Sequence, residues 1–244
     1  MILSKRLTQI EALITSEYTH IWDTCCDHGY LGESLISHQK APNIHLVDIV
    51  PKIITPLNKR LSKLLSNPYS APSSHASPQT HWQTHCLDIS KLPLQKYSGK
   101  HLIIIAGIGG DLMIECMRRI MSEHSTREID FILCPVRHLH TLREQLIELK
   151  MTLKEEVLIK EKNIFYEILL LSNTSLLAGQ QTPLKPVSPV GDAIWQCKTI
   201  QDQSEAQEYL GIKIKHYLNM KRGLDTPEVN KIIQYYQNIT ISLA

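Results

Sequence analysis

The sequence predicts an α/β fold in which helices cover both faces of a mainly parallel β-sheet. Strand-like apolar runs alternate with helical segments as far as residue 149, a pattern typical of doubly wound sheets. The run HLIIIAG (101–107) is continuously apolar, as expected of a parallel strand buried on both faces. Two further strand-like runs within residues 153–172 are joined by a short polar turn. Together these observations predict a parallel sheet that ends in an antiparallel pair.

The individual elements follow from apolar spacing and from the residues that begin or end them. Apolar residues spaced three or four apart predict an amphipathic helix over residues 3–16. The strands expected next are 20–25, 43–49, 82–89, 101–107 and 130–135, and the helices among them are 30–39, 52–65, 109–121 and 138–149. Pro56 lies in the first turns of one helix, which allows a start later than Lys52. Residues 66–80 are rich in Ser and Pro and predict a surface loop.

The terminal hairpin distinguishes two kinds of doubly wound sheet. Its turn is expected near Lys162–Asn163. A dinucleotide-binding Rossmann sheet has no need of this pair, whereas the seven-stranded sheet of class I methyltransferases ends in it. We therefore predict a Rossmann-like methyltransferase domain over residues 1–172, whose strands and covering helices form a core of their own.

The rest of the chain predicts a linker and a small helical hairpin. Residues 173–190 contain Ser, Gly, Gln and three prolines, as a linker does. In residues 191–244, Gly223 suits the end of a first helix and Thr226–Pro227 the start of a second. The apolar residues expected on the facing sides of these helices are Ala206, Leu210, Ile214, Tyr217, Leu218, Val229, Ile232, Tyr236 and Ile239.

The composition of the 244 residues limits the class of protein. No stretch approaches the ~20 apolar residues of a membrane span, and the first residues lack the apolar core of a signal peptide. Six cysteines spread over the chain are unlike a secreted disulfide scaffold, so we expect a cytoplasmic protein with reduced thiols. A net charge of +2 is too small to indicate nucleic-acid binding by itself.

The stretch IWDTCCDHGYLG (21–32) places adjacent cysteines and a histidine at the end of the first strand. A zinc site is disfavoured because Cys25, Cys26 and His28 lack the usual ligand spacing and no second cluster completes the set. A redox pair is disfavoured because adjacent cysteines rarely form a disulfide. We therefore predict no metal site, and we interpret Cys26 as a small buried residue.

Polar and glycine residues follow successive strands at the edge where open α/β sheets bind ligands. Asp48 ends the second strand, where a carboxylate can accept hydrogen bonds from both ribose hydroxyls. Asp88 ends the third strand, and Gly107, Gly109 and Gly110 follow the fourth, where missing side chains let a ligand approach. Each Asp alone is more often a cap or turn residue, and GIGG alone is explained by a tight turn. The whole row favours S-adenosylmethionine as the ligand.

Motifs along nearly the whole chain resemble one known family. In the order found in the bacterial tRNA (adenine(22)-N1)-methyltransferase family, the chain contains KRL (5–7), DTCCDHGYLG (23–32), IIIAGIGG (103–110), FILCPVRHLHTLREQL (131–146) and NIFYEILLL (163–171). That family usually has D-I-G-S-D-H-x-Y-L-P near the first strand, A-G-M-G-G after the fourth, and a C-terminal coiled-coil hairpin. Here Cys25 and Cys26 replace Gly and Ser, and Gly32 replaces Pro. A left-handed backbone at Cys25 would cost ~1–2 kcal/mol, so a reshaped turn or weaker cofactor binding is expected.

The resemblance implies an enzyme that uses S-adenosylmethionine to methylate N1 of an adenine in tRNA, and we expect a monomer or weak dimer. Cofactor contacts are implied for Asp23, Cys25, His28, Gly29, Tyr30, Asp48, Ile49, Asp88, Ile89, Gly107, Ile108, Gly109 and Gly110. Basic residues expected to meet RNA phosphates, although each alone is more often simply solvated, are Lys5, Arg6, Arg137, Lys213, Lys215, Lys221 and Arg222. Asp27 is the candidate catalytic carboxylate, with helix capping an equally good explanation.

Two other classes of function remain open at this stage. One is methylation of another RNA or of a small molecule. The other is a non-catalytic RNA-binding protein that retains the fold, which a cofactor site blocked by Cys25 would favour. Methyl-transfer assays distinguish the first class, and cofactor calorimetry distinguishes the second.

Overall fold

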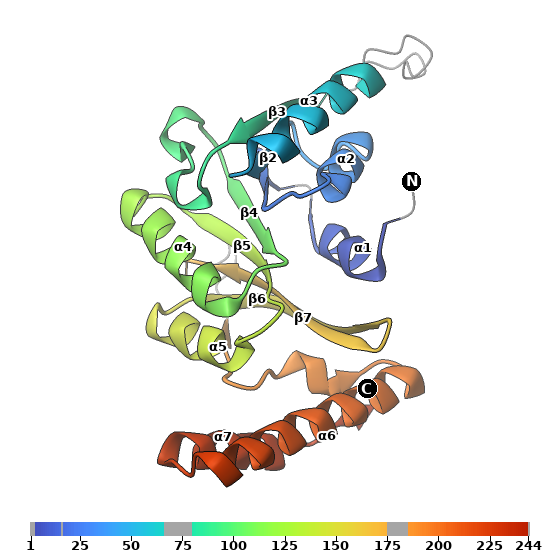
Figure 1. Ribbon diagram of the computed structural model, residues 1–244, viewed down its shortest axis with the longest axis vertical. Helices are drawn as coiled ribbons and strands as arrows, with labels where there is room; N and C mark the ends of the chain where they lie inside the picture. The colour runs from blue at the N-terminus through green and yellow to red at the C-terminus, as the bar shows by residue number, and fades with distance from the viewer. Residues whose placement is uncertain (1–2, 16, 66–79, 175–184, 244) are drawn as a thin grey trace.

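One large mixed sheet with helices on both faces dominates the structure, a computed structural model that describes residues 3–15, 17–65, 80–174 and 185–243 (Figure 1). The strand order is β3-β2-β1-β4-β5-β7-β6-β8. The strands are β1 (His20–Thr24), β2 (Asn43–Asp48), β3 (His81–Cys86), β4 (His101–Ala106), β5 (Ile129–Cys134), β6 (Thr152–Glu161), β7 (Ile164–Ser172) and β8 (Lys185–Pro186). The first five in spatial order are parallel and the last three antiparallel to their neighbours, so the predicted α/β class is confirmed.

The predicted strand count of seven is wrong, because β8 adds an eighth strand. β8 pairs with the start of β6, opposite Thr152 and Leu153. Two residues carry too little periodicity to be seen as a strand in a sequence. The predicted hairpin turn at Lys162–Asn163 is confirmed, and both residues have positive φ, 49° and 64°, as a tight two-residue hairpin turn requires.

Helices follow most of the predicted positions with shorter or shifted ends. They are α1 (Lys5–Ala12), α2 (Tyr30–Ser37), α3 (Pro51–Leu65), α4 (Gly110–Glu123), α5 (Leu139–Glu148), α6 (Ile200–Gly223) and α7 (Pro227–Gln237). The later start allowed for α3 is not observed, because Pro51 begins the helix and Pro56 lies inside it. Pro56 removes one backbone hydrogen bond there, and its ring crowds the carbonyl of Lys52. The predicted loop 66–80 lies outside the described residues except for Thr80, which is buried.

Neighbouring residues of the central strands enter two cores on opposite faces of the sheet. Ile21 of β1 packs in the core that includes α1, α2 and α3, whereas Trp22 packs in the core that includes α4 and α5. In β4, Leu102 and Ile104 enter the first core and their neighbours enter the second. This period of two explains why β4 is apolar at every position after His101.

A row of imidazoles crosses the α4 side of the sheet. His45 on β2 lies between His20 on β1 and His85 on β3, with ring nitrogens 3.1 Å and 3.0 Å apart. The other nitrogen of His20 lies 3.1 Å from the carbonyl oxygen of Ser98. Because a carbonyl only accepts, His20 donates through Nε2, and the same donor direction then runs from His85 through His45. Burial lowers the pKa of each of the three rings, which favours the neutral forms that this arrangement uses.

The centre of the row is buried, and its environment opposes protonation. His45 is 3% exposed, and its ring stacks on Trp22 with centroids 3.8 Å apart. Burial, followed by the neighbouring imidazoles, lowers the pKa of His45 to about 3. Burial also lowers the pKa of His101, whose Nδ1 accepts the Trp22 indole hydrogen, to about 4.

The C-terminal helices pack through a third apolar cluster against the end of the β6–β7 hairpin. Phe165 of β7 meets Tyr209 of α6, and Tyr217 of α6 stacks on Tyr236 of α7. The predicted apolar faces contribute to this cluster except for Leu218, which is 42% exposed, and Val229, which is buried outside it. The division at residues 1–172, 173–190 and 191–244 stays a prediction. No helix in the described part of the chain is long and apolar enough to cross a membrane.

A buried ion network joins α5, the hairpin and α6. Arg143 contacts Glu156 at 2.7 Å and Glu167 at 2.5 Å, and all three side chains are fully buried. Glu156 also accepts hydrogen bonds from the backbone N–H groups of residues 192–193. Glu167 accepts one from the Tyr209 hydroxyl at 2.6 Å. Each buried charge therefore has partners, as a low-dielectric interior requires.

Candidate active site

The carboxyl ends of β1, β2 and β3 bring three predicted aspartates near the Cys25 thiol. Burial, with smaller contributions from the charges of Asp48, Asp23 and Asp88, raises the pKa of Cys25 to about 12. The thiol is therefore protonated at neutral pH and is a poor nucleophile in this state. The structure thus places four of the predicted cofactor residues at one edge of the sheet.

The loop between β1 and α2 contains three left-handed backbone positions. The φ angle is 54° at Cys25, 46° at Asp27 and 69° at Gly29. The backbone at Cys25 is left-handed, the conformation for which a cost was given, and such a residue is held in place by its surroundings. Gly29 is the N-cap of α2, and a Cβ at this position would come within 2.5 Å of Leu57. Helix capping by Asp27 is therefore wrong, because Gly29 occupies the capping position.

Asp23 joins β1 to α2 inside the protein. Its side chain is 4% exposed, and one carboxylate oxygen accepts the Gly32 N–H at 2.9 Å. Burial raises the pKa of Asp23 to about 7. A Cβ on Gly32 would come within 2.4 Å of Leu46, so the glycine lets α2 approach the sheet closely enough for this bond.

Asp48 fixes two loops and lies beside exposed apolar side chains. Its carboxylate accepts the Val50 N–H at 3.0 Å and the Asp27 N–H at 3.4 Å. Ile49 is 62% exposed and Val50 is 40% exposed, which leaves an uncovered apolar surface next to a carboxylate. A ribose with an attached base presents the complementary combination of hydroxyl donors and an apolar ring.

Asp88 is a helix-capping residue, which was the alternative interpretation of this aspartate. It accepts the Ser90 N–H at 2.8 Å and caps the short 3-10 helix Ile89–Lys91. These hydrogen bonds from Ser90 lower the pKa of Asp88, so the side chain is ionised at neutral pH. Ile89 is half-buried and packs against the core on the α4 side.

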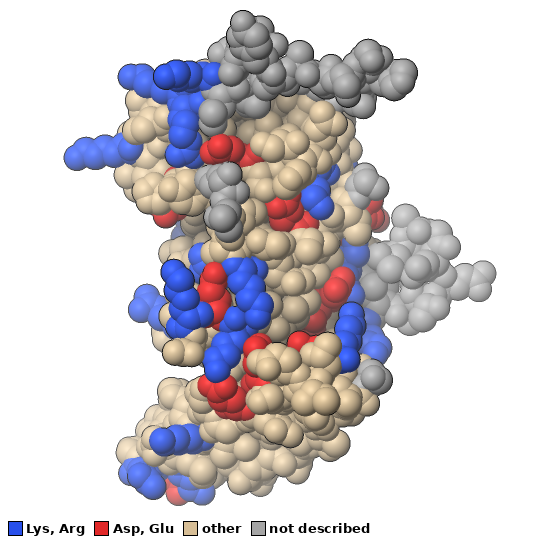
Figure 2. Space-filling model, turned by 90° about the vertical axis from the view of Figure 1, so that its right-hand side faces the viewer, with Lys and Arg blue, Asp and Glu red and all other residues tan. Residues whose placement is uncertain are grey.

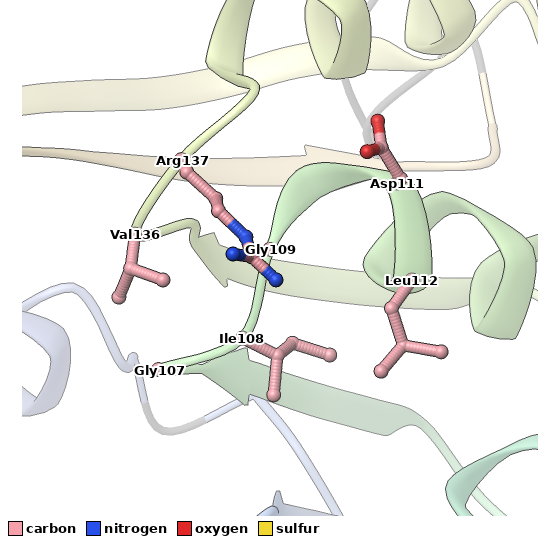
Figure 3. Close-up of a pocket in the computed structure, with 7 residues that line it drawn as sticks. All are labelled: Gly107, Ile108, Gly109, Asp111, Leu112, Val136 and Arg137. Carbon is pink, nitrogen blue, oxygen red and sulfur yellow. The ribbon is translucent and has the colours of Figure 1, made fainter.

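A cavity of about 430 Å³ opens beside the end of β4 (Figure 3). Its lining residues are Gly107, Ile108, Gly109, Asp111, Leu112, Val136 and Arg137. Val136 donates its N–H to the Ile108 carbonyl at 3.1 Å, and Gly110 donates its N–H to the Arg137 carbonyl at 3.0 Å. These two bonds fix the loop after β4 against the loop after β5.

The glycines of this loop have different reasons to be glycine. Gly107 has φ of 86°, and a Cβ would meet nothing within 4 Å, so the residue faces open space. A ligand can therefore approach its backbone. Gly110, in contrast, would place a Cβ 2.6 Å from the His138 carbonyl oxygen. It is required by the packing of the two loops.

Other predicted site residues lie around the β1–α2 loop. Asp27 is exposed, lies 3.9 Å from the His28 ring and does not line the cavity. Tyr30 is 44% exposed, with the Arg60 guanidinium 5.7 Å from its ring centre. Arg60 also donates to the His28 carbonyl at 2.5 Å, which holds this loop against α3. Sequence analysis missed Arg60, because a basic residue on a helix is usually solvated.

The predicted RNA-binding residues occupy several places rather than one surface. Figure 2 shows basic side chains on one face in small groups interleaved with acidic ones. Of the seven, only Arg137 lines the cavity. Arg6 lies over the Tyr166 ring at 5.0 Å, and Lys213 over the Tyr209 ring at 4.9 Å. Lys221 lies 3.9 Å from Asp225.

The cysteines show no sign of a shared site. All six are free, and Cys26 is buried, as interpreted from the sequence. Within the described ranges, no three His, Cys, Asp or Glu side chains are arranged to hold a metal ion.

The sequence over residues 3–169 matches the family described as "Methyltransferase domain". The chain belongs to this methyltransferase family. The match covers both the β1–α2 loop and the cavity. No curated protein sequence matches the chain significantly.

Solved structures similar to this methyltransferase share its fold over almost the whole chain. M. capricolum TrmK, in complex with the cofactor product S-adenosyl-homocysteine, is 20% identical, with a TM-score of 0.68 over 98% of this chain and 100% of its own. The B. subtilis M1A22 tRNA methyltransferase TrmK is 20% identical, with a TM-score of 0.57 over 97% and 95%. A Streptococcus agalactiae protein of the NADB-Rossmann superfamily is 14% identical, with a TM-score of 0.68 over 97% and 96%.

Proposed function

We propose that this methyltransferase transfers a methyl group from S-adenosylmethionine to N1 of an adenine in tRNA, at the position equivalent to that of the B. subtilis m1A22 enzyme. The observation that carries the proposal is the shared edge at which the parallel strands β2, β1 and β4 end, which carries Asp48, Cys25 and Gly107, with a cavity beside Gly107. The likeness to TrmK structures extends beyond the methyltransferase domain into the C-terminal helices, which supports the same class of substrate.

The side chains at this edge fit the cofactor. Asp48 would hold the ribose hydroxyls, and Ile49 together with Ile89 would contact the adenine ring of the cofactor. Cys25 and Gly107 would face the methionine part, because Gly107 leaves open space where any side chain would project. The neutral Cys25 thiol is compatible with this position, since it adds no charge beside a sulfonium.

Positioning is what the protein contributes to this reaction. When bound, the cofactor supplies an electrophilic methyl group, and its S–CH3 bond breaks as the N1–CH3 bond forms. Adenine N1 carries a lone pair, so no side chain has to remove a proton before attack. The joined loops after β4 and β5 hold one wall of the site rigidly, which favours in-line geometry. The methylated base is cationic, and Asp27 remains the candidate carboxylate for stabilising it.

The test combines cofactor binding with nucleoside analysis. Purified protein is titrated with S-adenosylmethionine by calorimetry and then incubated with unmodified tRNA. The tRNA is digested, and its nucleosides are identified by mass spectrometry, alongside tRNA from a deletion strain. We expect 1-methyladenosine from the reaction and its absence in the deletion strain. Cofactor binding without any tRNA product would refute the tRNA proposal, and absent cofactor binding would favour a non-catalytic protein.

A further inference from the structure

The cavity beside Gly107 shares Gly107, Ile108 and Gly109 with the predicted cofactor residues, and its other lining residues come from α4 and the loop before α5. Its walls are the end of β4, the first turn of α4 and the loop before α5. None of Asp23, Asp48 and Asp88 lines it. The cavity therefore adjoins Gly107, where the methionine part of the cofactor would lie, and is separate from the ribose-binding residue Asp48. This is where the methyl acceptor would bind.

One wall of the cavity is an apolar platform. Ile108, Leu112 and Val136 project toward the same side, as Figure 3 shows. Leu112 is 52% exposed and Val136 is 51% exposed, although both are large aliphatic side chains. Ligand pockets combine such apolar walls with few polar groups, and a cavity of about 430 Å³ falls in their usual size range. A flat, weakly polar ring would cover this platform.

Arg137 is the cation held over this cavity. In the described part of the chain its side chain has no hydrogen-bond or ion-pair partner, whereas Arg118 and Arg119 on α4 each pair with a glutamate. Its side chain lies against Gly109, where a Cβ would be 3.0 Å from Nε and 3.3 Å from Cγ. Gly109 therefore leaves the room in which the arginine lies. A guanidinium without a partner at a ligand cavity matches a phosphate, which it can bind through two parallel hydrogen bonds.

The acidic residue of the cavity does not neutralise Arg137. Asp111 contacts the ring of His138 at the start of α5, and its carboxylate points away from the side to which Leu112 projects (Figure 3). The N-cap of α4, Gly109, makes no side-chain capping bond, so the amide groups of the first turn add a favourable field for an anion.

We propose that this cavity is the acceptor subsite for one unstacked purine nucleotide of an RNA, with its base on the Ile108–Leu112–Val136 platform and its phosphate on Arg137. The inference rests on the proposed function and adds how the acceptor is held. A nucleotide joins a flat base to a single charged group, as the cavity joins an apolar wall to one cation. Adenine N1 lies on the pairing edge, so the base has to leave its stack before it can reach the methyl group.

The test compares three variants for cofactor binding and for transfer to unmodified tRNA. Arg137→Ala removes the phosphate contact, Leu112→Ala reduces the platform, and Arg119→Ala is the matched control on the exposed side of α4. We expect all three to bind S-adenosylmethionine as the wild type does. Arg137→Ala should lower kcat/KM about 10- to 100-fold, mainly through KM, as expected for a lost hydrogen bond to a charged group. The salt dependence of tRNA binding by Arg137→Ala should be weaker by the equivalent of about one phosphate contact.

A second measurement separates the two parts of the subsite without requiring transfer. Protein saturated with S-adenosylhomocysteine is titrated with adenosine and with adenosine 5′-monophosphate. Wild-type protein should prefer the monophosphate about tenfold, Arg137→Ala should lose that preference, and Leu112→Ala should weaken both ligands equally. Equal behaviour of Arg137→Ala and Arg119→Ala in both measurements overturns the inference. If wild-type protein methylates no tRNA, the proposed function fails, and an absent monophosphate preference then overturns the subsite separately.

Discussion

The buried imidazole row predicts that the protein loses stability in mild acid, and His45 is the residue with which to measure it. The substitution His45→Asn removes the titrating ring at the centre of the row but keeps a polar side chain. We expect the variant to be less stable than the wild type at pH 7.5, because it loses the stacking contact with Trp22 and the imidazole hydrogen bonds to His20 and His85. Its free energy of unfolding should nevertheless depend less steeply on pH.

The magnitude follows from the difference in proton binding between the folded and unfolded states. Burial lowers the pKa of His45 from 6.5 to about 3, so between these values the unfolded chain binds a proton that the folded protein excludes. Stability from this group is therefore fully present above pH 6.5 and is lost as the pH falls. One such proton changes the free energy of unfolding by ~1.4 kcal/mol per pH unit, or ~2 kcal/mol at pH 5.

Urea unfolding followed by far-UV circular dichroism between pH 4.5 and 7.5 measures this slope. Fluorescence is avoided because Trp22 touches the substituted residue. His81→Asn, on the exposed face of β3, is the matched control and should keep the wild-type slope. If the free energy of unfolding depends on pH equally steeply below pH 6.5 in His45→Asn and in the wild type, His45 is not held neutral in the folded protein.

Three further substitutions test the site and the C-terminal packing. Asp48→Ala should weaken S-adenosylmethionine binding by about 1.5–3 kcal/mol in calorimetry, and unchanged affinity in a folded variant would remove this residue from the site. Cys25→Gly should stabilise the protein by about 1 kcal/mol in urea unfolding and retain or improve cofactor binding, because it relieves the left-handed backbone at φ of 54°; Cys26→Gly, without such a backbone, should destabilise it. Tyr209→Phe should destabilise by about 1.5–3 kcal/mol through the hydrogen bond lost from buried Glu167, whereas Tyr235→Phe on α7 should have little effect; equal effects would deny the network its role.

Most of the fold could be predicted because its strands and helices carry their own periodic patterns. β4 and β5 are apolar at nearly every position since both faces are covered, and the hairpin turn at Lys162–Asn163 has residues that tolerate positive φ. β8 could not be predicted, since two residues at an edge have no pattern. The gathering of the predicted site residues at one edge could be predicted because parallel strands all end at the same edge of a sheet.

Contacts that depend on strand register or on helix docking could not be predicted. His20, His45 and His85 are 25 and 40 residues apart, and only the parallel pairing of three strands places them in one row. Glu156 and Glu167 look like solvent-facing positions of an alternating hairpin, yet both are buried under the C-terminal segment. The left-handed angle at Cys25 was expected only as a possible cost, because a single sequence does not give backbone angles.

Helix α5 links the C-terminal segment to the cavity, because it contacts the segment and begins next to the cavity wall. This helix begins at Leu139, two residues after Arg137, and carries Arg143. Besides its two glutamates, Arg143 donates to the Ser188 carbonyl at 2.9 Å, so the helix is fixed to the segment that leads into α6. Removing one partner of a buried ion group leaves an uncompensated charge, which costs more than the loss of a surface contact. The position of the cavity wall therefore depends on the C-terminal segment even where that segment touches no ligand, and a loss of activity on truncating the chain would not by itself demonstrate an RNA contact there.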